Sequence, residues 1–435
     1  MSSAAIAVPF STRTLDNGLR VLATANAALH RAHVALYVRV GSRFEEPKTN
    51  GLSHFLEHML YRGTSRMKSA HEVNLAFESL GGSLYAATQA DFGVFSVTLP
   101  PENLERATEL FAEVMLDPAF LDIEIEKGIV CEEILEDVDD EGRQVDPDNL
   151  SRMLVYPTHP LGFTIAGDEA RVRSFDEAAV RAHHGRHYAA SSSVLAFSGA
   201  IDEGRALDLG ERVLGAMKRG TRIETPPPAH AQREARLQIV ENVSSQTELR
   251  VLFRAFSEIS PDRPALDALM RIIHDGMSTR LYRRICDDQG LCYDVSCGYD
   301  GYEDDGLVDF AAGVVHERTT KVTTEILALM TELATEGPSE DELSRCKTRH
   351  AWDMSAQRDA CEDIAGFFAG GLLFGRFETP EERQHKLDAV TRDDVVRVAR
   401  EITKPSHLNV LAVGLLEDDE DKRLSDAVNA WRGVA

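Results

Sequence analysis

A proline-rich segment near the midpoint most constrains how this chain of 435 residues can fold. The run Thr225-Pro226-Pro227-Pro228-Ala229-His230 cannot continue a helix or a central strand, because proline fixes φ and lacks a backbone N–H. It predicts a stiff, extended linker, and the chain is too long for one ordinary domain. We therefore predict two domains, residues 1–224 and 233–435, joined by the linker 225–232.

The two predicted halves carry a similar pattern. Val180-Arg181 precedes the apolar run Val194-Leu195-Ala196-Phe197, and 216 residues further on Val396-Arg397 precedes Val410-Leu411-Ala412-Val413. A repeat of this length indicates a duplicated domain, because the repeats of solenoid proteins are about 20–50 residues long. Chance similarity between two helix–strand units is the alternative interpretation.

The first half mixes strands and helices without a regular β–α–β alternation. Asn17-Gly18 is typical of a tight hairpin, and the alternating apolar residues from Val34 to Val40 predict a half-buried strand. Two helices are expected, one after Pro100-Pro101 and one from about Ile123 to Val138. The first of these has an apolar side formed by Leu104, Ala107, Phe111, Val114 and Met115. This mixture favours the α+β class.

Charge and composition limit the partners of the chain. With 72 acidic and 47 basic side chains, the net charge of −25 argues against nucleic acid or an anionic membrane surface as the main partner. No apolar run approaches the roughly 18 residues of a membrane span, and Met1–Phe10 lack the basic start of a signal sequence. The six cysteines form no CxxC pair and are expected to be reduced thiols. We therefore expect a cytoplasmic protein.

One motif carries catalytic chemistry. In His54-Phe55-Leu56-Glu57-His58, a helix would project both histidines from the same side, where they can bind one metal ion. Glu57 would lie beside that ion, while Phe55, Leu56, Met59 and Leu60 face elsewhere and can anchor the helix in a core. A hydrolytic zinc site takes three protein ligands and leaves a position for water, whose proton a nearby carboxylate accepts. Glu57 is placed for that role.

A third ligand must come from another segment. The expected helix after residue 123 offers Glu126, Glu132, Glu133 and Glu136, and the seven-residue spacing of Glu126 and Glu133 puts both on one face. The alternative is a solvated helix with two surface histidines, which the apolar neighbours of His54 and His58 argue against. The nearby group His183, His184 and His187 matches no ligand pattern and is expected at the surface.

The segment Gly41–Thr64, GSRFEEPKTNGLSHFLEHMLYRGT, closely resembles the inverted-zinc-motif peptidases of the pitrilysin and mitochondrial processing peptidase family, family M16. The opening TLDNGLRVL resembles the first hairpin of that family, and the run from Glu126 to Glu133 resembles its third-ligand helix. Matched position by position, the resemblance implies that His54, His58 and Glu133 bind zinc. By the same resemblance, Glu57 occupies the position of the catalytic base, and Glu126 occupies that of the acidic residue that supports the site.

The resemblance also implies a fold and a function. The expected fold is two homologous α+β domains, each a mixed, mostly antiparallel sheet with helices packed on one face, forming half of a clam-shell chamber. The expected function is that of a zinc-dependent endopeptidase subunit, with one Zn²⁺ per chain, which cleaves oligopeptides or unfolded segments. The alternative is a non-catalytic scaffold or peptide-binding subunit of a larger complex. Such subunits tend to lose the zinc ligands, which this chain retains.

Family members bind an extended peptide along the edge of a sheet. The matching segment runs from Gly81 to Gln89, where Ala86 and Ala87 leave room for a second backbone. Together with Thr88, these residues are predicted to bind substrate. Family members usually have Asn where this chain has Tyr85.

The second half departs from the family pattern at one position. Active members carry an Arg and, seven residues later, a Tyr, and both residues act on the substrate. In this chain Tyr293 matches the Tyr, but Cys286 occupies the Arg position. A thiol cannot give the planar, charged donation of a guanidinium. Three interpretations are open. The site works with Tyr293 alone, or an altered backbone brings Arg283 or Arg284 to the substrate. In the third, a related subunit supplies the Arg/Tyr pair. Because short family members pair two chains, a heterodimer is favoured over a homodimer.

Overall fold

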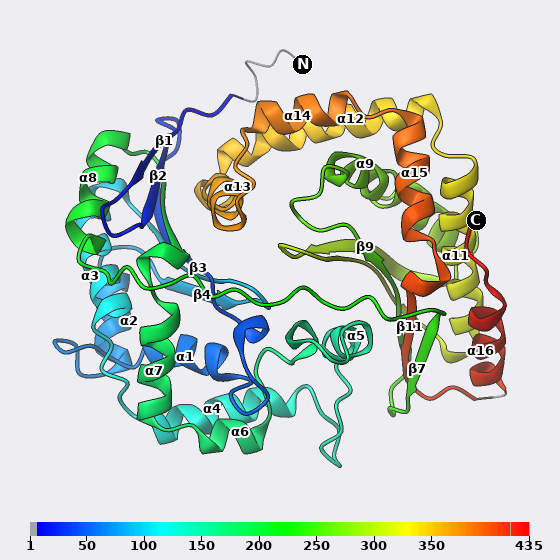
Figure 1. Ribbon diagram of the computed structural model, residues 1–435, viewed down its shortest axis with the longest axis horizontal. Helices are drawn as coiled ribbons and strands as arrows, with labels where there is room; N and C mark the ends of the chain where they lie inside the picture. The colour runs from blue at the N-terminus through cyan, green and yellow to red at the C-terminus, as the bar shows by residue number, and fades with distance from the viewer. Residues whose placement is uncertain (1–6, 418, 435) are drawn as a thin grey trace. The chain divides into compact units, whose positions relative to one another are not determined.

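The computed structural model describes residues 7–417 and 419–434 and divides into two compact units (Figure 1). Unit 1 comprises the described residues of Met1–Leu135, Phe163–Pro226 and Trp352–Glu381. Unit 2 comprises those of Glu136–Gly162, Pro227–Ala351 and Glu382–Ala435. Residues 1–6, on which part of the predicted absence of a signal sequence rests, lie outside the described residues.

Unit 1 contains a six-stranded sheet in the order β1-β2-β6-β3-β5-β4. Its strands are β1 Ser11–Thr14, β2 Arg20–Ala25, β3 Ala32–Val38, β4 Leu84–Thr88, β5 Gly93–Leu99 and β6 Ser193–Gly199. Strands β2 and β6 run parallel, and all other neighbours run antiparallel. The predicted Asn-Gly hairpin is confirmed, because β1 and β2 pair antiparallel on either side of Asn17-Gly18.

One face of this sheet packs against helices to form the main core of unit 1. Val21 and Ala23 of β2 and Val34 and Leu36 of β3 belong to this core. The helices of this part of the chain are α1 Leu52–Leu60, α2 Ala70–Glu78, α3 Leu104–Leu116, α4 Ile123–Leu135, α6 Glu169–Ser174, α7 Glu177–His187 and α8 Glu203–Leu214. The five apolar residues predicted for one side of α3 are all buried, which confirms that expectation.

The opposite face of the sheet is covered by α13, Cys361–Phe374, which comes from the second half of the sequence (Figure 1). Phe368 of α13 is fully buried against Leu22, Val194 and Ala196. The strand predicted to be half-buried, β3, is therefore buried on both faces, and Ala35 has no exposed surface. That expectation was wrong because α13, which is distant in sequence, packs against β3.

Unit 2 repeats the strand arrangement of unit 1. Its sheet has the order β7-β11-β8-β10-β9, formed by β7 Arg236–Val240, β8 Thr247–Ala255, β9 Cys292–Gly301, β10 Gly306–Val314 and β11 Leu408–Val413. Its parallel pair, β7 and β11, matches β2 and β6, so the two apolar runs of the predicted repeat occupy equivalent strands. The helices of the second half are α9 Arg263–Ile273, α10 Arg280–Tyr282, α11 Thr319–Thr335, α12 Glu340–Ala356, α14 Pro380–Asp388, α15 Arg392–Ile402 and α16 Glu420–Ala430.

Each unit includes a helix from the other half of the sequence. Helix α5, Pro147–Val155, packs on β8 and β11 of unit 2, where Leu150 is buried with Leu411 and Val413. Helix α13 covers the equivalent strands β3 and β6 of unit 1. The α+β fold class is confirmed, whereas the predicted boundaries of domains and linker stay predictions. Residues 218–233 contain no helix or strand.

Among the described helices, none combines the length and the apolar character needed to span a bilayer. All six cysteines are free thiols.

Phe368→Ala should destabilise the chain by about 3–5 kcal/mol, because it leaves a cavity between α13 and the sheet of unit 1. Urea unfolding followed by circular dichroism measures this change. Leu75→Ala on α2 is the control, because the Leu75 side chain is 50% exposed and should contribute little. Equal effects of the two substitutions would show that α13 does not support the sheet.

Candidate metal centre

The N-terminus of α1, the helix with the His-x-x-Glu-His motif, is fixed by Gly51 and Glu45. Gly51 has φ of 94°, a conformation that glycine adopts readily, and a Cβ there would lie 2.5 Å from the Ala166 carbonyl oxygen. The buried Glu45 carboxylate accepts hydrogen bonds from the backbone N–H groups of Gly51 at 2.9 Å and Ser53 at 2.7 Å. Burial raises the pKa of Glu45, and these hydrogen bonds oppose the rise.

Sequence reasoning missed Glu45. The available signal was an acidic residue shortly before a helix start, where carboxylates satisfy free N–H groups and the helix dipole. This contact supports the motif directly, because it fixes the first turn of α1, and Ser53, one of its donors, directly precedes His54.

The apolar side of α1 anchors it as predicted: Phe55, Leu56, Met59 and Leu60 have no exposed surface. Behind α1, Ser53 Oγ lies 3.0 Å from His183 Nε2 of α7. The expectation that His183 and His187 lie at the surface was wrong, because α7 packs against α1 and leaves them 8% and 1% exposed. Burial lowers the pKa of both imidazoles, that of His187 to about 4, so they are neutral near pH 7.

The structure brings His54, His58 and Glu133 together. One potential ligand atom from each lies within 4.8 Å of the others. His54 Nε2 is 3.4 Å from Glu133 Oε1, and His58 Nε2 is 3.5 Å from Glu133 Oε2. These contacts form where α4 packs against α1. Two helices thus present two imidazole nitrogens and one carboxylate to a single point.

Glu126, two helical turns before Glu133 on α4, holds His58 from behind. Its Oε1 lies 2.8 Å from His58 Nδ1, and its Oε2 lies 3.0 Å from Arg62 Nε. A hydrogen bond at Nδ1 fixes the ring and leaves Nε2 to face Glu133, as in the carboxylate–histidine pairs that support metal sites. Glu126 is only 5% exposed, so the contact is shielded from water.

The electrostatic field at this point favours a cation. Burial lowers the pKa of His58, but the hydrogen bond with Glu126 and the charges of Glu126, Glu133 and Glu57 outweigh it and raise the pKa overall. The hydrogen bond with His54, together with the charges of His54 and His58, lowers the pKa of Glu133 although burial opposes this. Two imidazoles and a carboxylate form a ligand set of catalytic zinc sites, so these residues fit a zinc ion.

Glu57 meets the end of strand β4. Thr88, the last residue of β4, donates a hydrogen bond from Oγ1 to Glu57 Oε2 at 2.5 Å. Among the described strands, β4 pairs only with β5, so its outer edge is open, and Ala86 and Ala87 lie along it half-buried. Sequence reasoning assigned Thr88 to substrate binding and missed its contact with Glu57, which joins residues distant in sequence.

The residues predicted to act from the second half belong to unit 2. The Tyr293 side chain is 92% exposed on β9, and its role in substrate binding stays a prediction. Cys286 lies in a π-helical turn, Arg283–Asp287, with its Sγ 3.9 Å from Cys292 Sγ. Arg284 donates to Glu332 of α11 at 2.5 Å, so its guanidinium is already engaged within unit 2.

The sequence matches a known family over most of its length. Residues 20–169 match the family described as Insulinase (Peptidase family M16), and residues 174–349 match the Peptidase M16 inactive domain. The chain therefore belongs to peptidase family M16. It is similar to an "uncharacterized zinc protease" of Rickettsia felis, 27% identical over 404 residues, which cover 90% of this chain and 95% of that protein.

Solved structures share the fold. A protease from Helicobacter pylori superimposes with a TM-score of 0.86 at 22% identity and covers 94% of this chain and 100% of its own. The periplasmic protease PqqL from Escherichia coli gives a TM-score of 0.78 at 20% identity, with 98% of this chain but only 52% of PqqL covered. This chain thus corresponds in fold to about half of PqqL.

Glu126→Gln should weaken zinc binding by about 10–100-fold, because the imidazole of His58 loses its charged partner. Competition with a chromogenic zinc chelator measures the affinity. Glu132→Gln is the matched control, since Glu132 is exposed on the same helix and should leave the affinity unchanged. If both variants bind zinc as the wild type does, Glu126 does not support a metal site.

Proposed function

We propose that this chain is a zinc-dependent endopeptidase subunit that hydrolyses oligopeptides or unfolded segments inside a closed chamber. The convergence of His54, His58 and Glu133, with Glu57 beside the open edge of β4, carries the proposal. Membership of family M16 and the relatives named zinc proteases support it.

In this proposal His54, His58 and Glu133 hold one zinc ion per chain. When bound, zinc supplies Lewis acidity, which lowers the pKa of a water molecule and polarises a carbonyl group. Glu57 is the general base: its carboxylate takes a proton from the attacking water and passes it to the nitrogen of the leaving amine. The hydrogen bond from Thr88 Oγ1 orients this carboxylate.

The edge of β4 is the proposed substrate site. An extended peptide can add to an open strand through backbone hydrogen bonds, and the short side chains of Ala86 and Ala87 permit close approach. Thr88 ends this strand at Glu57, so a peptide paired along β4 reaches the base without a further connecting element.

We further propose that a second M16-like subunit completes the enzyme, as a heterodimer rather than a homodimer. The fold correspondence to about half of PqqL supports a two-chain assembly. Cys286 stands at the expected Arg position, and Arg284 is held by Glu332, which favours an Arg/Tyr pair from a partner chain. The cytoplasmic location stays a prediction.

A second candidate is a non-catalytic, peptide-binding subunit of a larger complex. Cys286 favours it, because this chain lacks the expected guanidinium at that position. The two candidates share the zinc site and differ in turnover, so cleavage in the presence of a partner subunit separates them.

Glu57→Gln should keep one zinc per chain and reduce peptide cleavage by about 10²–10⁴-fold, since the amide cannot accept the proton of the attacking water. Zinc content by elemental analysis and cleavage of a quenched fluorescent peptide, each with and without the co-purified partner, provide the two measurements. Glu102→Gln, a change at an exposed glutamate, is the control. Cleavage by Glu57→Gln at the wild-type rate would refute the mechanism. A wild-type chain that binds zinc yet cleaves nothing with its partner would favour the second candidate.

A further inference from the structure

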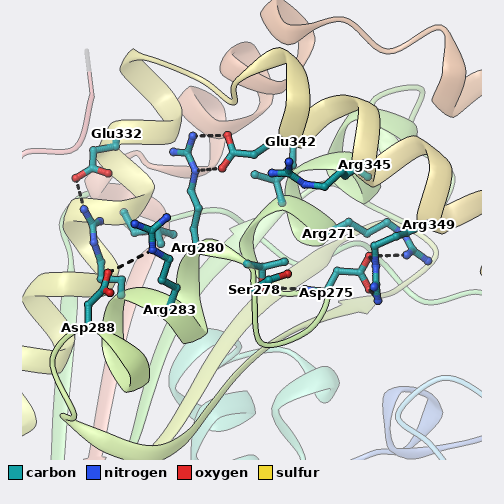
Figure 2. Close-up of a pocket in the computed structure, with 15 residues that line it drawn as sticks. Arg271, Asp275, Ser278, Arg280, Arg283, Asp288, Glu332, Glu342, Arg345 and Arg349 are labelled. Carbon is teal, nitrogen blue, oxygen red and sulfur yellow. Dashed lines mark hydrogen bonds and ion pairs between the residues drawn. The ribbon is translucent and has the colours of Figure 1, made fainter.

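A cavity of about 310 Å³ lies within unit 2, among α9, α10, the turn Arg283–Asp287, α11 and α12 (Figure 2). No residue of the zinc site lines it. This volume lies at the lower end of the range of small-molecule sites, about 300–1,000 Å³. Six arginines line the cavity: Arg271, Arg280, Arg283, Arg284, Arg345 and Arg349. Four carboxylates share the wall: Asp275, Asp288, Glu332 and Glu342.

Arginines already pair with all four carboxylates. Two of these pairs are close: Glu342 accepts a bidentate pair of hydrogen bonds from Arg280 at 2.7 and 2.8 Å, and Glu332 accepts one from Arg284 at 2.5 Å. The hydrogen bond from Arg280 lowers the pKa of Glu342 to about 2, so this carboxylate is ionised near pH 7.

The remaining carboxylates are engaged as well. Asp275 accepts from Arg271 at 2.9 Å and from Arg349 at 3.0 Å, and Asp288 lies 3.4 Å from Arg283. The wall therefore offers no unpaired carboxylate to attract a metal or an amine.

The wall has an excess of positive charge. Its six guanidinium groups exceed its four carboxylates by two, in a chain with a net charge of −25. Within the described residues, Arg345 has no hydrogen-bond or ion-pair partner, and Figure 2 shows its side chain between Glu342 and Arg349. Among the described residues that line the cavity, Arg345 is thus the one arginine that no carboxylate pairs with.

We propose that this cavity binds a small oligophosphate anion, with Arg345 as a direct contact. Guanidinium groups match phosphate oxygens in bidentate geometry and keep their charge at all physiological pH values. The paired arginines hold the walls in place, while Arg345 supplies the affinity. The inference goes beyond the peptidase function and does not depend on it, since all lining residues lie outside the zinc site.

Isothermal titration of the full-length chain with tripolyphosphate, at constant ionic strength, tests the proposal. The wild type should bind one anion per chain, and Arg345→Gln should weaken binding by about tenfold or more, as expected for a lost hydrogen bond between charged groups. Arg233→Gln is the matched control: Arg233 is an exposed arginine of the same unit outside the cavity. All three proteins keep the same zinc site, so heat from chelation of zinc by tripolyphosphate is common to them.

Three outcomes would overturn the proposal. The first is the absence of saturable binding to the wild type. The second is equal affinity of wild type and Arg345→Gln, which would leave the arginines as a structural network. The third is equally tight binding of citrate, which would show that charge alone, rather than phosphate chemistry, is recognised.

Discussion

The candidate metal centre depends on the packing of α1 against α4, which brings His54, His58 and Glu133 to one point. This arrangement brings carboxylates and imidazoles together in a partly buried place, which is costly where a buried group is unpaired. Glu126 pairs with His58, and Glu45 satisfies the start of α1. The apolar side of α1 packs into the core beside the sheet, so the ligand geometry is fixed from three directions.

The exchange of α5 and α13 between the halves of the sequence gives both sheets a second covered face. In unit 1, α13 buries the side of β2, β3 and β6 that faces away from the main core. In unit 2, α5 does the same for β8 and β11. Strand β4 pairs with β5 alone among the described strands, and its last residue, Thr88, contacts Glu57. Each half of the sequence therefore contributes to the stability of both units.

Local patterns in the sequence predicted the features that depend on neighbouring residues. Helical spacing placed His54 and His58 together and Glu126 with Glu133, and the apolar run of α3 marked its buried side. The repeat of 216 residues identified equivalent strands, because β6 and β11 keep their apolar runs. Contacts between distant segments were not predictable in this way. Three examples are the hydrogen bond from Thr88 to Glu57, the burial of His183 by α1 and the covering of β3 by α13. None of them produces a periodic pattern in a single sequence.

X-ray absorption at the zinc edge of the purified, zinc-loaded chain tests which residues bind the metal. We expect one zinc per chain, with nitrogen and oxygen ligands at about 2.0–2.2 Å, the multiple-scattering signature of two imidazoles and no sulfur. A sulfur shell at about 2.3 Å would place the metal on cysteines instead, and a chain that retains no zinc would remove the site altogether. Either result would contradict the assignment of His54, His58 and Glu133 as the metal ligands.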